Sequence, residues 1–449
     1  MTKRNFLVPW LICGLGALFY CYEYVLRIMP SVMASDLMQT FDINAFALGN
    51  LAAFYYYAYT PMQLPVGVLM DRYGPRRLLV IAALACALGS YLFSHGNIHV
   101  AHFGRFMVGF GSAFAFVGVL KLATIWLPPT RFAMIAGWIT TLGMLGAMGG
   151  VRLMGNLVQN IGWVEVTNFA VIGGVIIAAV FWFAIPHHKK YSPPANNVVK
   201  PTLSFKKLLR EVVQLLEKPQ IWLVGLVGLA LYIPLSVFAE LWGIPFLQRT
   251  YDVPSIRADH LVSMIFLGWA IGSPITGWIS DQLRNRRMPL IIGSAMAAVI
   301  VVLILYFPHI TKAHLGLWFL AFGIASSVEV VVFAIAREIS PPELAATAMA
   351  ITNLLVMLGG VVFQPVLGML LDMFAGTHAT GSLSVYSGRN FQDAMAILPI
   401  GLILSVVILL FITETHAKVI GAPEGADNED NAERSSSNNY SREKLAATV

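Results

Sequence analysis

Long apolar stretches separated by short polar segments repeat along the whole chain. The stretches hold about 20 residues, the length that an α-helix needs to cross the hydrocarbon core of a bilayer. This pattern predicts an all-α membrane protein with twelve transmembrane helices. We place the spans at residues 7–31, 45–70, 78–96, 101–126, 132–160, 165–185, 220–247, 258–281, 288–307, 314–337, 345–374 and 393–413.

Two polar segments divide the pattern. The first, HHKKYSPPANNVVKPTLSFKKLLREVVQLLEKPQ, is basic and proline-rich and follows the sixth span. It is expected to be a cytoplasmic linker (187–219) between two six-helix bundles, residues 1–186 and 220–415. The second, residues 416–449, has a composition that cannot bury a core and is expected to be disordered. At the start, MTKRNF precedes a long apolar run without a cleavage site, which predicts a retained first helix rather than a signal peptide.

The composition agrees with a chain whose main solvent is lipid. Of its 449 residues 57% are hydrophobic and 12% are charged, whereas an average soluble domain has about 25% charged residues. Too little polar surface remains to cover a soluble core. The cysteines Cys13, Cys21 and Cys86 lie in apolar stretches and form no C-x-x-C pair, so neither a disulfide framework nor a metal site is expected.

The positive charges predict the orientation. With the N-terminus inside, 22 of the 29 Lys and Arg residues fall in inner segments, and the outer loops hold only Arg249, Arg257, Lys312 and Arg389. Because Lys and Arg near span ends favour the cytoplasmic side, both termini are expected in the cytoplasm. A bacterial inner membrane fits this topology. The net charge of +6 is attributed to topology and not to nucleic-acid binding.

The two halves of the chain contain matching stretches. TFDI recurs as TYDV, and GVLMDRYGPRR recurs as GWISDQLRNRR, both 210 residues later. PPTRFAMIAGWITTLGMLG aligns with PPELAATAMAITNLLVMLG at an offset of 213 residues. Internal repeats of this kind are typical of transporters whose halves move against each other around a central site.

The residues of these stretches also resemble a known family. GVLMDRYGPRR is similar to the signature loop between helices 2 and 3 of the major facilitator superfamily, and GRFMVGFGSA resembles its helix 4 motif, with Arg105 as the arginine. The resemblance covers about residues 5–415 and implies a twelve-helix secondary transporter that works by alternating access. It implies a gating role for Gly67, Asp71, Arg72, Gly74 and Arg76. For Arg76 and Arg77, enforcing the topology is the competing interpretation.

One motif departs from the drug/proton antiporters of this family. These often carry glycines around a Gly-Pro in helix 5, whereas GMLGAMGG has Ala147 at the position of the proline. The departure argues against export of amphiphilic drugs or siderophore-like compounds, which stays as an alternative.

Charged residues within the predicted spans mark a candidate site, because a charge inside the bilayer is costly and usually faces a cavity. In the family that the chain resembles, helices 1, 4, 7 and 10 line the central cavity, and most of these charges lie on those helices. They are Glu23 and Arg27 in helix 1, Arg105 and Lys121 in helix 4, Arg152 in helix 5, Glu240 near the outer end of helix 7, and Glu329 in helix 10.

Glu23 and Arg27 are four residues apart on one helix face, so their side chains can meet. An arginine fork suits bidentate capture of a carboxylate or phosphate, so Arg27 is predicted to bind an anionic group of the substrate. Glu23 is predicted to orient Arg27 or to carry a proton. The competing interpretation is a self-neutralising ion pair that only lets the helix enter the membrane.

The other candidates are less sharply defined. Glu329 has no partner within one helical turn and is predicted to couple protons or bind a substrate amine, with pairing across the cavity and inert burial as alternatives. Lys121 is expected to snorkel to the cytoplasmic edge, and Arg152 could reach the cavity from a glycine-rich face. In the helix 2 stretch FYYYAYTPMQLP, which Pro61 and Pro65 should bend, the candidate cavity residues are Tyr56, Tyr57 and Tyr59, with packing as the alternative.

No enzyme motif is evident. The chain has no Gly-Lys dipeptide and hence no phosphate loop, and it lacks H-E-x-x-H and G-x-S-x-G. We therefore predict a monomeric secondary transporter without a cofactor, which moves a small anionic or zwitterionic solute (an amino acid, a short peptide or an organic acid) in symport with protons. The alternative of another class is a non-transporting membrane sensor, although neither the linker nor the tail resembles a folded sensory domain.

Overall fold

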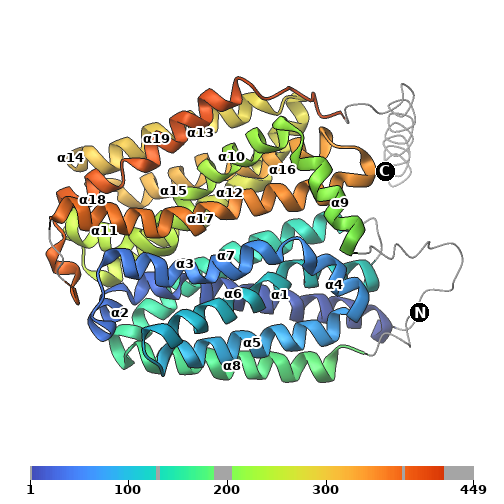
Figure 1. Ribbon diagram of the computed structural model, residues 1–449, viewed down its shortest axis with the longest axis horizontal. Coiled ribbons are helices and arrows are strands. Elements are labelled where there is room, and N and C mark those ends of the chain that lie inside the picture. The colour runs from blue at the N-terminus through green and yellow to red at the C-terminus, as the bar shows by residue number, and fades with distance from the viewer. Residues whose placement is uncertain (1–2, 128–131, 187–204, 377–379, 419–449) are drawn as a thin grey trace, which may run out of the picture.

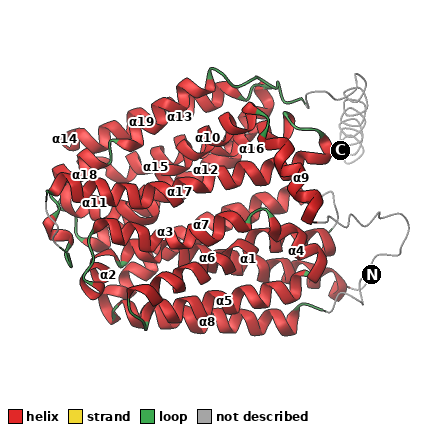
Figure 2. Ribbon diagram, viewed as in Figure 1, coloured by secondary structure: helices red, strands yellow, loops and turns green. Residues whose placement is uncertain are grey.

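The protein is described here by a computed structural model that covers residues 3–127, 132–186, 205–376 and 380–418. These residues form helices joined by short loops, and no strand occurs among them (Figure 2). Ten helical segments in this part of the chain are long and apolar enough to cross a membrane. The prediction of an all-α membrane protein is therefore confirmed.

The first half of the chain forms one bundle. It begins with α1 (Lys3–Val32), which contains Pro30, and the short α2 (Ala34–Phe41). The second predicted span is formed by α3 (Ala45–Met62) and α4 (Pro65–Tyr73). The remaining helices are α5 (Pro75–Ser94), α6 (Ile98–Trp126), α7 (Phe132–Ile161) and α8 (Trp163–Ala184).

The second half forms the other bundle. Its first span begins with α10 (Pro219–Ile233), continues through the π-helix η3 (Pro234–Trp242) and ends with α11 (Gly243–Thr250). The tenth predicted span is likewise divided, into α15 (Leu315–Ser326), the 3-10 turn η5 (Ser327–Val330) and α16 (Val331–Glu338). The others are α12 (Ser255–Leu283), α13 (Arg287–Tyr306), α14 (Pro308–Thr311), α17 (Ala345–Ala375), α18 (Gly388–Ala394) and α19 (Ile397–Leu409), with short 3-10 turns at Lys312–His314, Pro342–Leu344 and Leu383–Val385.

Two predicted spans, 45–70 and 132–160, are helical but are not among the ten segments. The first is divided at Gln63, between Pro61 inside α3 and Pro65 at the start of α4. Because proline has no N–H to donate, the two prolines weaken the helix at this point, as the sequence predicts. The second span is the 30-residue α7.

Figure 1 shows the two halves of the chain side by side, the first coloured blue to green and the second light green to red. The amphipathic helix α9 (Phe205–Leu216), from the predicted linker, lies at the end of the molecule where α1 begins. We call this the linker end; α2 and α11 lie at the opposite end. Residues 187–204 of the predicted linker are outside the described residues, as are residues 419–449 of the segment 416–449 that was predicted to be disordered. The domain boundaries stay predictions.

The most extensive contacts between the halves are those of α3 with α17 and of α7 with α12. Between α3 and α17 the backbones approach closely, because glycines stand at the contact. A Cβ on Gly49 would lie 2.4 Å from the carbonyl oxygen of Gln364, and one on Gly368 would lie 2.2 Å from that of Ala45.

At the opposite end, Asp372 of α17 binds the first turn of α3. Its Oδ2 accepts a hydrogen bond from the N–H of Phe46 (2.9 Å), and its Oδ1 accepts one from the N–H of Ala45 (3.2 Å). The hydroxyl of Tyr386 also donates to Oδ1 (2.5 Å). Further along, the N–H of Gly381 donates to the carbonyl of Ile43 (3.1 Å). The halves are thus hydrogen-bonded together at this end.

Candidate functional site

Arg105 of α6 completes the backbone hydrogen bonding of α1 next to Arg27. Pro30 lacks the N–H that would otherwise bond to the carbonyl of Leu26. Arg105 supplies the missing donor: its Nη1 donates to the Leu26 carbonyl (2.8 Å) and its Nη2 to that of Arg27 (3.3 Å). The side chain is buried, 4% exposed. Arg105 therefore binds the backbone of α1 at Arg27, the residue whose side chain forms the centre of the site.

The side chain of Arg27 lies between carboxylates from both halves of the molecule. Its Nη2 and Nε lie 2.6 Å and 2.9 Å from Oε1 of Glu23. From the second half, the hydroxyl of Tyr232 accepts a hydrogen bond from Nη1 (3.0 Å), and Oε1 of Glu240 lies 3.9 Å from Nη1. Arg27, Glu23 and Glu240 are 3%, 0% and 1% exposed. One buried guanidinium is therefore placed between two buried carboxylates.

Tyrosine hydroxyls bind both carboxylates. The hydroxyl of Tyr55 donates to Oε1 of Glu23 and that of Tyr56 donates to Oε2 of Glu240, both through short hydrogen bonds. Each carboxylate keeps one buried oxygen, Oε2 of Glu23 and Oε1 of Glu240, without a hydrogen-bond partner among the described residues. The site therefore has unused acceptor positions for a proton or for a donor of the solute.

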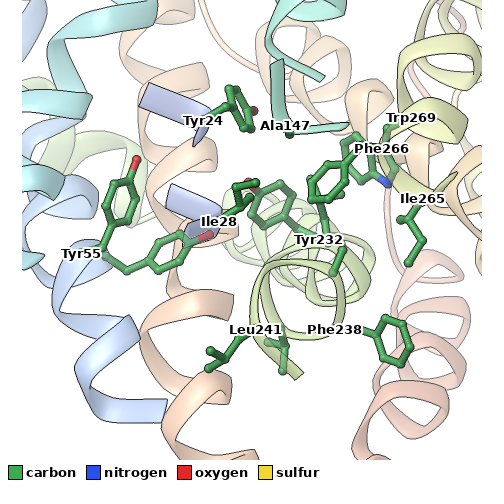
Figure 3. Packing of buried hydrophobic residues seen from close by; sticks show 14 of the residues in the cluster. Tyr24, Ile28, Tyr55, Ala147, Tyr232, Phe238, Leu241, Ile265, Phe266 and Trp269 are labelled. Carbon is green, nitrogen blue, oxygen red and sulfur yellow. The ribbon is translucent and has the colours of Figure 1, made fainter. Parts of the chain in front are cut away.

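Aromatic rings surround the guanidinium. The centroids of Tyr24, Tyr59 and Tyr55 lie 4.6, 4.9 and 5.2 Å from Cζ of Arg27. A cation over an aromatic face is stabilised by the ring quadrupole, most strongly where water is excluded. Figure 3 shows Tyr24, Tyr55 and Tyr232 around one region between the halves, with Trp269 of α12 beside Tyr232.

Glu240 belongs to the π-helix η3 and lies inside a segment that continues to Thr250. The sequence analysis placed it near the outer end of its span, because the predicted span ended at 247 and a regular helix was assumed. π-Helical turns occur often at functional sites. Here the amide of Gln364 donates to the carbonyl of Ser236 (2.6 Å) and thereby ties η3 to α17.

Three predicted site residues lie apart from this cluster. Tyr57 points elsewhere, and its hydroxyl donates to Oδ1 of Asn50 (2.8 Å). Arg152 of α7 crosses to the other half and donates from Nε to Oγ of Ser263 on α12 (2.8 Å). Glu329 is buried in η5, 3% exposed, and its side chain makes no hydrogen bond or ion pair with a described residue.

The residues of the signature loop interact within the first half. Gly74 joins α4 to α5 at φ +79°, a conformation that favours glycine. Nζ of Lys121 lies 2.5 Å from Oδ1 of Asp71, so Lys121 is paired, and the sequence analysis expected only snorkelling. Arg76 donates to the carbonyl of Trp182 (2.5 Å) and lies over its ring. The guanidinium of Arg72 lies 5.4 Å from the ring centroid of Tyr73, and a Cβ on Gly67 would meet open space.

Tyr55, Tyr232 and Asp259 were not among the predicted site residues. Tyr55 shares a helix face with Tyr59, four residues on, so the spacing could have indicated it. Tyr232 contacts Arg27, and Asp259 contacts α7 at Gly155. Both contacts depend on how the two halves pack together, which the sequence pattern does not indicate. In the described part of the chain no group of three or more His, Cys, Asp and Glu is arranged to bind a metal.

Comparisons with known proteins agree with this fold and with the signature motifs. The family model described as Major Facilitator Superfamily matches residues 14–364 and 242–433. The uncharacterized transporter YybO of Bacillus subtilis is 25% identical over 91% of this chain and 95% of its own length. The probable galactarate/D-glucarate transporter GudP of Escherichia coli is 21% identical over 84% and 92%.

A further relative, the membrane sensor protein UhpC of Salmonella typhimurium, is 25% identical over 88% of this chain and 91% of its own length. Among solved structures, a bacterial homolog of the human lysosomal transporter Spinster, in an inward-facing and unoccupied conformation, matches with a TM-score of 0.75 and 16% identity. It covers 92% of this chain and 98% of its own. The chain is thus a multi-pass integral membrane protein and belongs to the major facilitator superfamily.

Proposed function

We propose that this protein transports a small organic anion together with protons, and that Arg27 binds a carboxylate of that anion. The observation that carries the proposal is the buried Arg27 guanidinium between Glu23 and Glu240, one carboxylate from each half. Arg27 is the group in the cluster suited to bidentate binding of a carboxylate, since the guanidinium of Arg105 is bonded to the backbone of α1. Galactarate and glucarate, named for the relative GudP, are dicarboxylates, which favours an organic acid over an amino acid or a peptide.

The balance of charge explains why protons should accompany the solute. With both acids ionised, Glu23 and Glu240 carry two negative charges, and Arg27 and Arg105 carry two positive ones. A solute carboxylate would add a negative charge that nothing in the cluster compensates, and an uncompensated buried charge is very costly. A proton on Glu23 or Glu240 restores the balance and releases Arg27 from that acid.

The same contacts connect binding to the movement of the two halves. Arg27 and Tyr56 of the first half bind Tyr232 and Glu240 of the second half directly. A solute that replaces Glu240 at Arg27 changes the bonds between the halves at the centre of the molecule. Such a differential contact is what a ligand needs to shift a conformational equilibrium.

The orientation in the membrane, the oligomeric state and the cellular location are also parts of the proposal. The linker end carries most of the Lys and Arg residues and is assigned to the cytoplasm, with both termini there and a bacterial inner membrane as the location. The end at which Asp372 binds α3 is then the outer end, where these hydrogen bonds join the two halves. We propose a monomer, in which the gating residues of the signature loop and the proton site Glu329 keep their predicted roles.

The test is solute flux into proteoliposomes that contain the purified full-length protein, with galactarate and galactonate as probes and an imposed pH gradient. Arg27→Lys keeps the charge but removes the bidentate fork, and we expect transport to fall at least about tenfold, the loss of one good charged hydrogen bond. Tyr57→Phe is the matched control, because Tyr57 lies on the same helix as Tyr55 but outside the cluster.

Unchanged flux in Arg27→Lys would show that the anion binds elsewhere. The same assay addresses the second candidate function, a non-transporting sensor, which the relative UhpC supports. A sensor should bind the solute, seen as thermal stabilisation that Arg27→Gln removes, without carrying flux. Binding without flux under any pH gradient would therefore favour the sensor.

A further inference from the structure

Asp259 is a buried carboxylate that lies outside the Arg27 cluster. It is on α12, near the opposite end, and is 1% exposed. Neither of its carboxylate oxygens has a hydrogen-bond partner among the described residues. A carboxylate in the charged form would be strongly destabilised in such a place, because nothing replaces its hydration.

The space for this carboxylate is provided by a glycine of the other half. A Cβ on Gly155 of α7 would lie 2.0 Å from Oδ2 of Asp259, so the carboxylate rests directly on the α7 backbone. One turn along α7, Arg152 donates to Oγ of Ser263, which is one turn along α12. Asp259 therefore lies in the contact between α7 and α12, one of the two most extensive helix contacts between the halves.

No charged group on a neighbouring described element is paired with Asp259, so a negative charge on its carboxylate would not be neutralised. No ion pair or hydrogen bond joins it to any of them in the described part of the chain. Within α12, Arg257 and His260 are exposed. The helix α15, which also packs against α12, contains no charged residue. The other elements packed against α12 carry these charged residues: Arg152 on α7, Glu240 on η3, Arg249 on α11, Glu329 on η5, Arg287 on α13, and Arg337 and Glu338 on α16.

We infer that Asp259 is a second proton-binding site, which takes up a proton when α7 and α12 close over it at the outer end. Separation of the two helices exposes the carboxylate to water, where it releases the proton. Closing the outer end in this way consumes one proton, and opening it returns one. The inference rests on the proposed proton-coupled transport and adds the place where the outer gate binds its proton.

The experiment measures the closure directly. Nitroxide labels are placed at Gln159→Cys on α7 and Arg257→Cys on α12, both exposed, in full-length protein whose three native cysteines are replaced, in lipid nanodiscs. In the wild-type sequence the ratio of short to long distances should rise as the pH falls from roughly 8 to 5, by up to about tenfold for each pH unit over which one proton is taken up. Asp259→Asn should show the short distance at every pH.

Two variants complete the test. Gly155→Ala should lose the short distance at every pH, because its Cβ occupies the position of the carboxylate. Glu165→Gln removes an exposed carboxylate at the same end and should behave like the wild type. The inference is overturned if Asp259→Asn keeps the wild-type pH dependence, or if it shows the long distance throughout.

Failure of this inference can be distinguished from failure of the proposed anion site. Arg27→Lys should lose solute binding but keep the pH-dependent distance, whereas Asp259→Asn should keep solute binding. If Arg27→Lys binds and transports the solute normally while Asp259→Asn loses the pH dependence, the proposed anion site is wrong and the proton site at Asp259 is supported.

Discussion

At the scale of single residues, the structure separates two arginines that the sequence presents as equivalent. Arg27 and Arg105 are both buried, but only Arg27 contacts carboxylates of both halves. Arg105 donates to the carbonyls that precede Pro30 in α1. Arg105 was predicted to bind substrate, and its contacts favour a positioning role for it instead.

This difference gives a prediction. Arg105→Gln should leave the Leu26 carbonyl unpaired and lower the free energy of unfolding by about 1.5–3 kcal/mol, the usual range for a hydrogen bond with a charged donor. Pro30→Ala in the Arg105→Gln background should recover part of this loss, because the new N–H at position 30 bonds to Leu26. The measurement is thermal unfolding of the four proteins of the double-mutant cycle. If the two changes are simply additive, Arg105 does not act through the Leu26 carbonyl.

The sequence predicted those contacts of the cluster that are local. The spacing of Glu23 and Arg27 is sufficient for their contact, because residues four apart share a helix face. The contacts between Tyr56 and Glu240, or between Arg27 and Tyr232, depend on how two halves dock, which no local pattern encodes. The residues whose partners lie on another helix were therefore the ones that sequence reasoning missed or misplaced.

At the scale of elements, hydropathy predicted the positions of the spans but not their irregularities. The break at Gln63 was expected from Pro61 and Pro65. The π-helix η3 was not, because Pro234 at its start is also compatible with an ordinary bend. Asp259 was overlooked although it is the second residue of the predicted span 258–281, because its burial depends on the packing of α7 against α12.

The contact between α17 and α3 leads to a prediction about the gate. Asp372→Asn removes the negative charge that caps the first turn of α3, a change worth about 1 kcal/mol at a helix N-terminus. The ratio of separated to joined halves at this end should therefore rise about fivefold. It is measured as the distance between labels at Phe46→Cys and Met373→Cys, two exposed positions on α3 and α17.

The matched control is Asp393→Asn, which breaks a 3.2 Å pair with Arg389 at the same end without touching α3. It should leave the label distance unchanged. An equal response to both substitutions would show that the general charge at this end, and not the cap on α3, stabilises the joined state.

At the scale of the whole molecule, the charge of the site is divided unequally between the halves. The first half contributes Glu23, Arg27 and Arg105, with one net positive charge, and the second half contributes Glu240, with one negative charge. The site is balanced only while the halves are together. A solute anion that binds Arg27 can substitute for Glu240 only if Glu240 or Glu23 becomes neutral. The number of protons that cross with the solute therefore equals the number of negative charges that the solute adds to the site, which is one for each carboxylate bound at Arg27.

The last prediction concerns this stoichiometry. Galactonate, a monoanion, should move with one proton and carry no net charge, so its flux should not respond to an imposed membrane potential. Galactarate, a dianion of the same carbon count, should move with the same proton and respond to the potential. In Glu240→Gln the site has a permanent extra positive charge, and galactonate should then move without a proton and become sensitive to the potential. Both fluxes are measured in proteoliposomes at fixed pH with potassium-diffusion potentials of either sign. A potential-sensitive galactonate flux in the wild-type protein would contradict the charge balance, because the solute would then have to cross with a number of protons other than one.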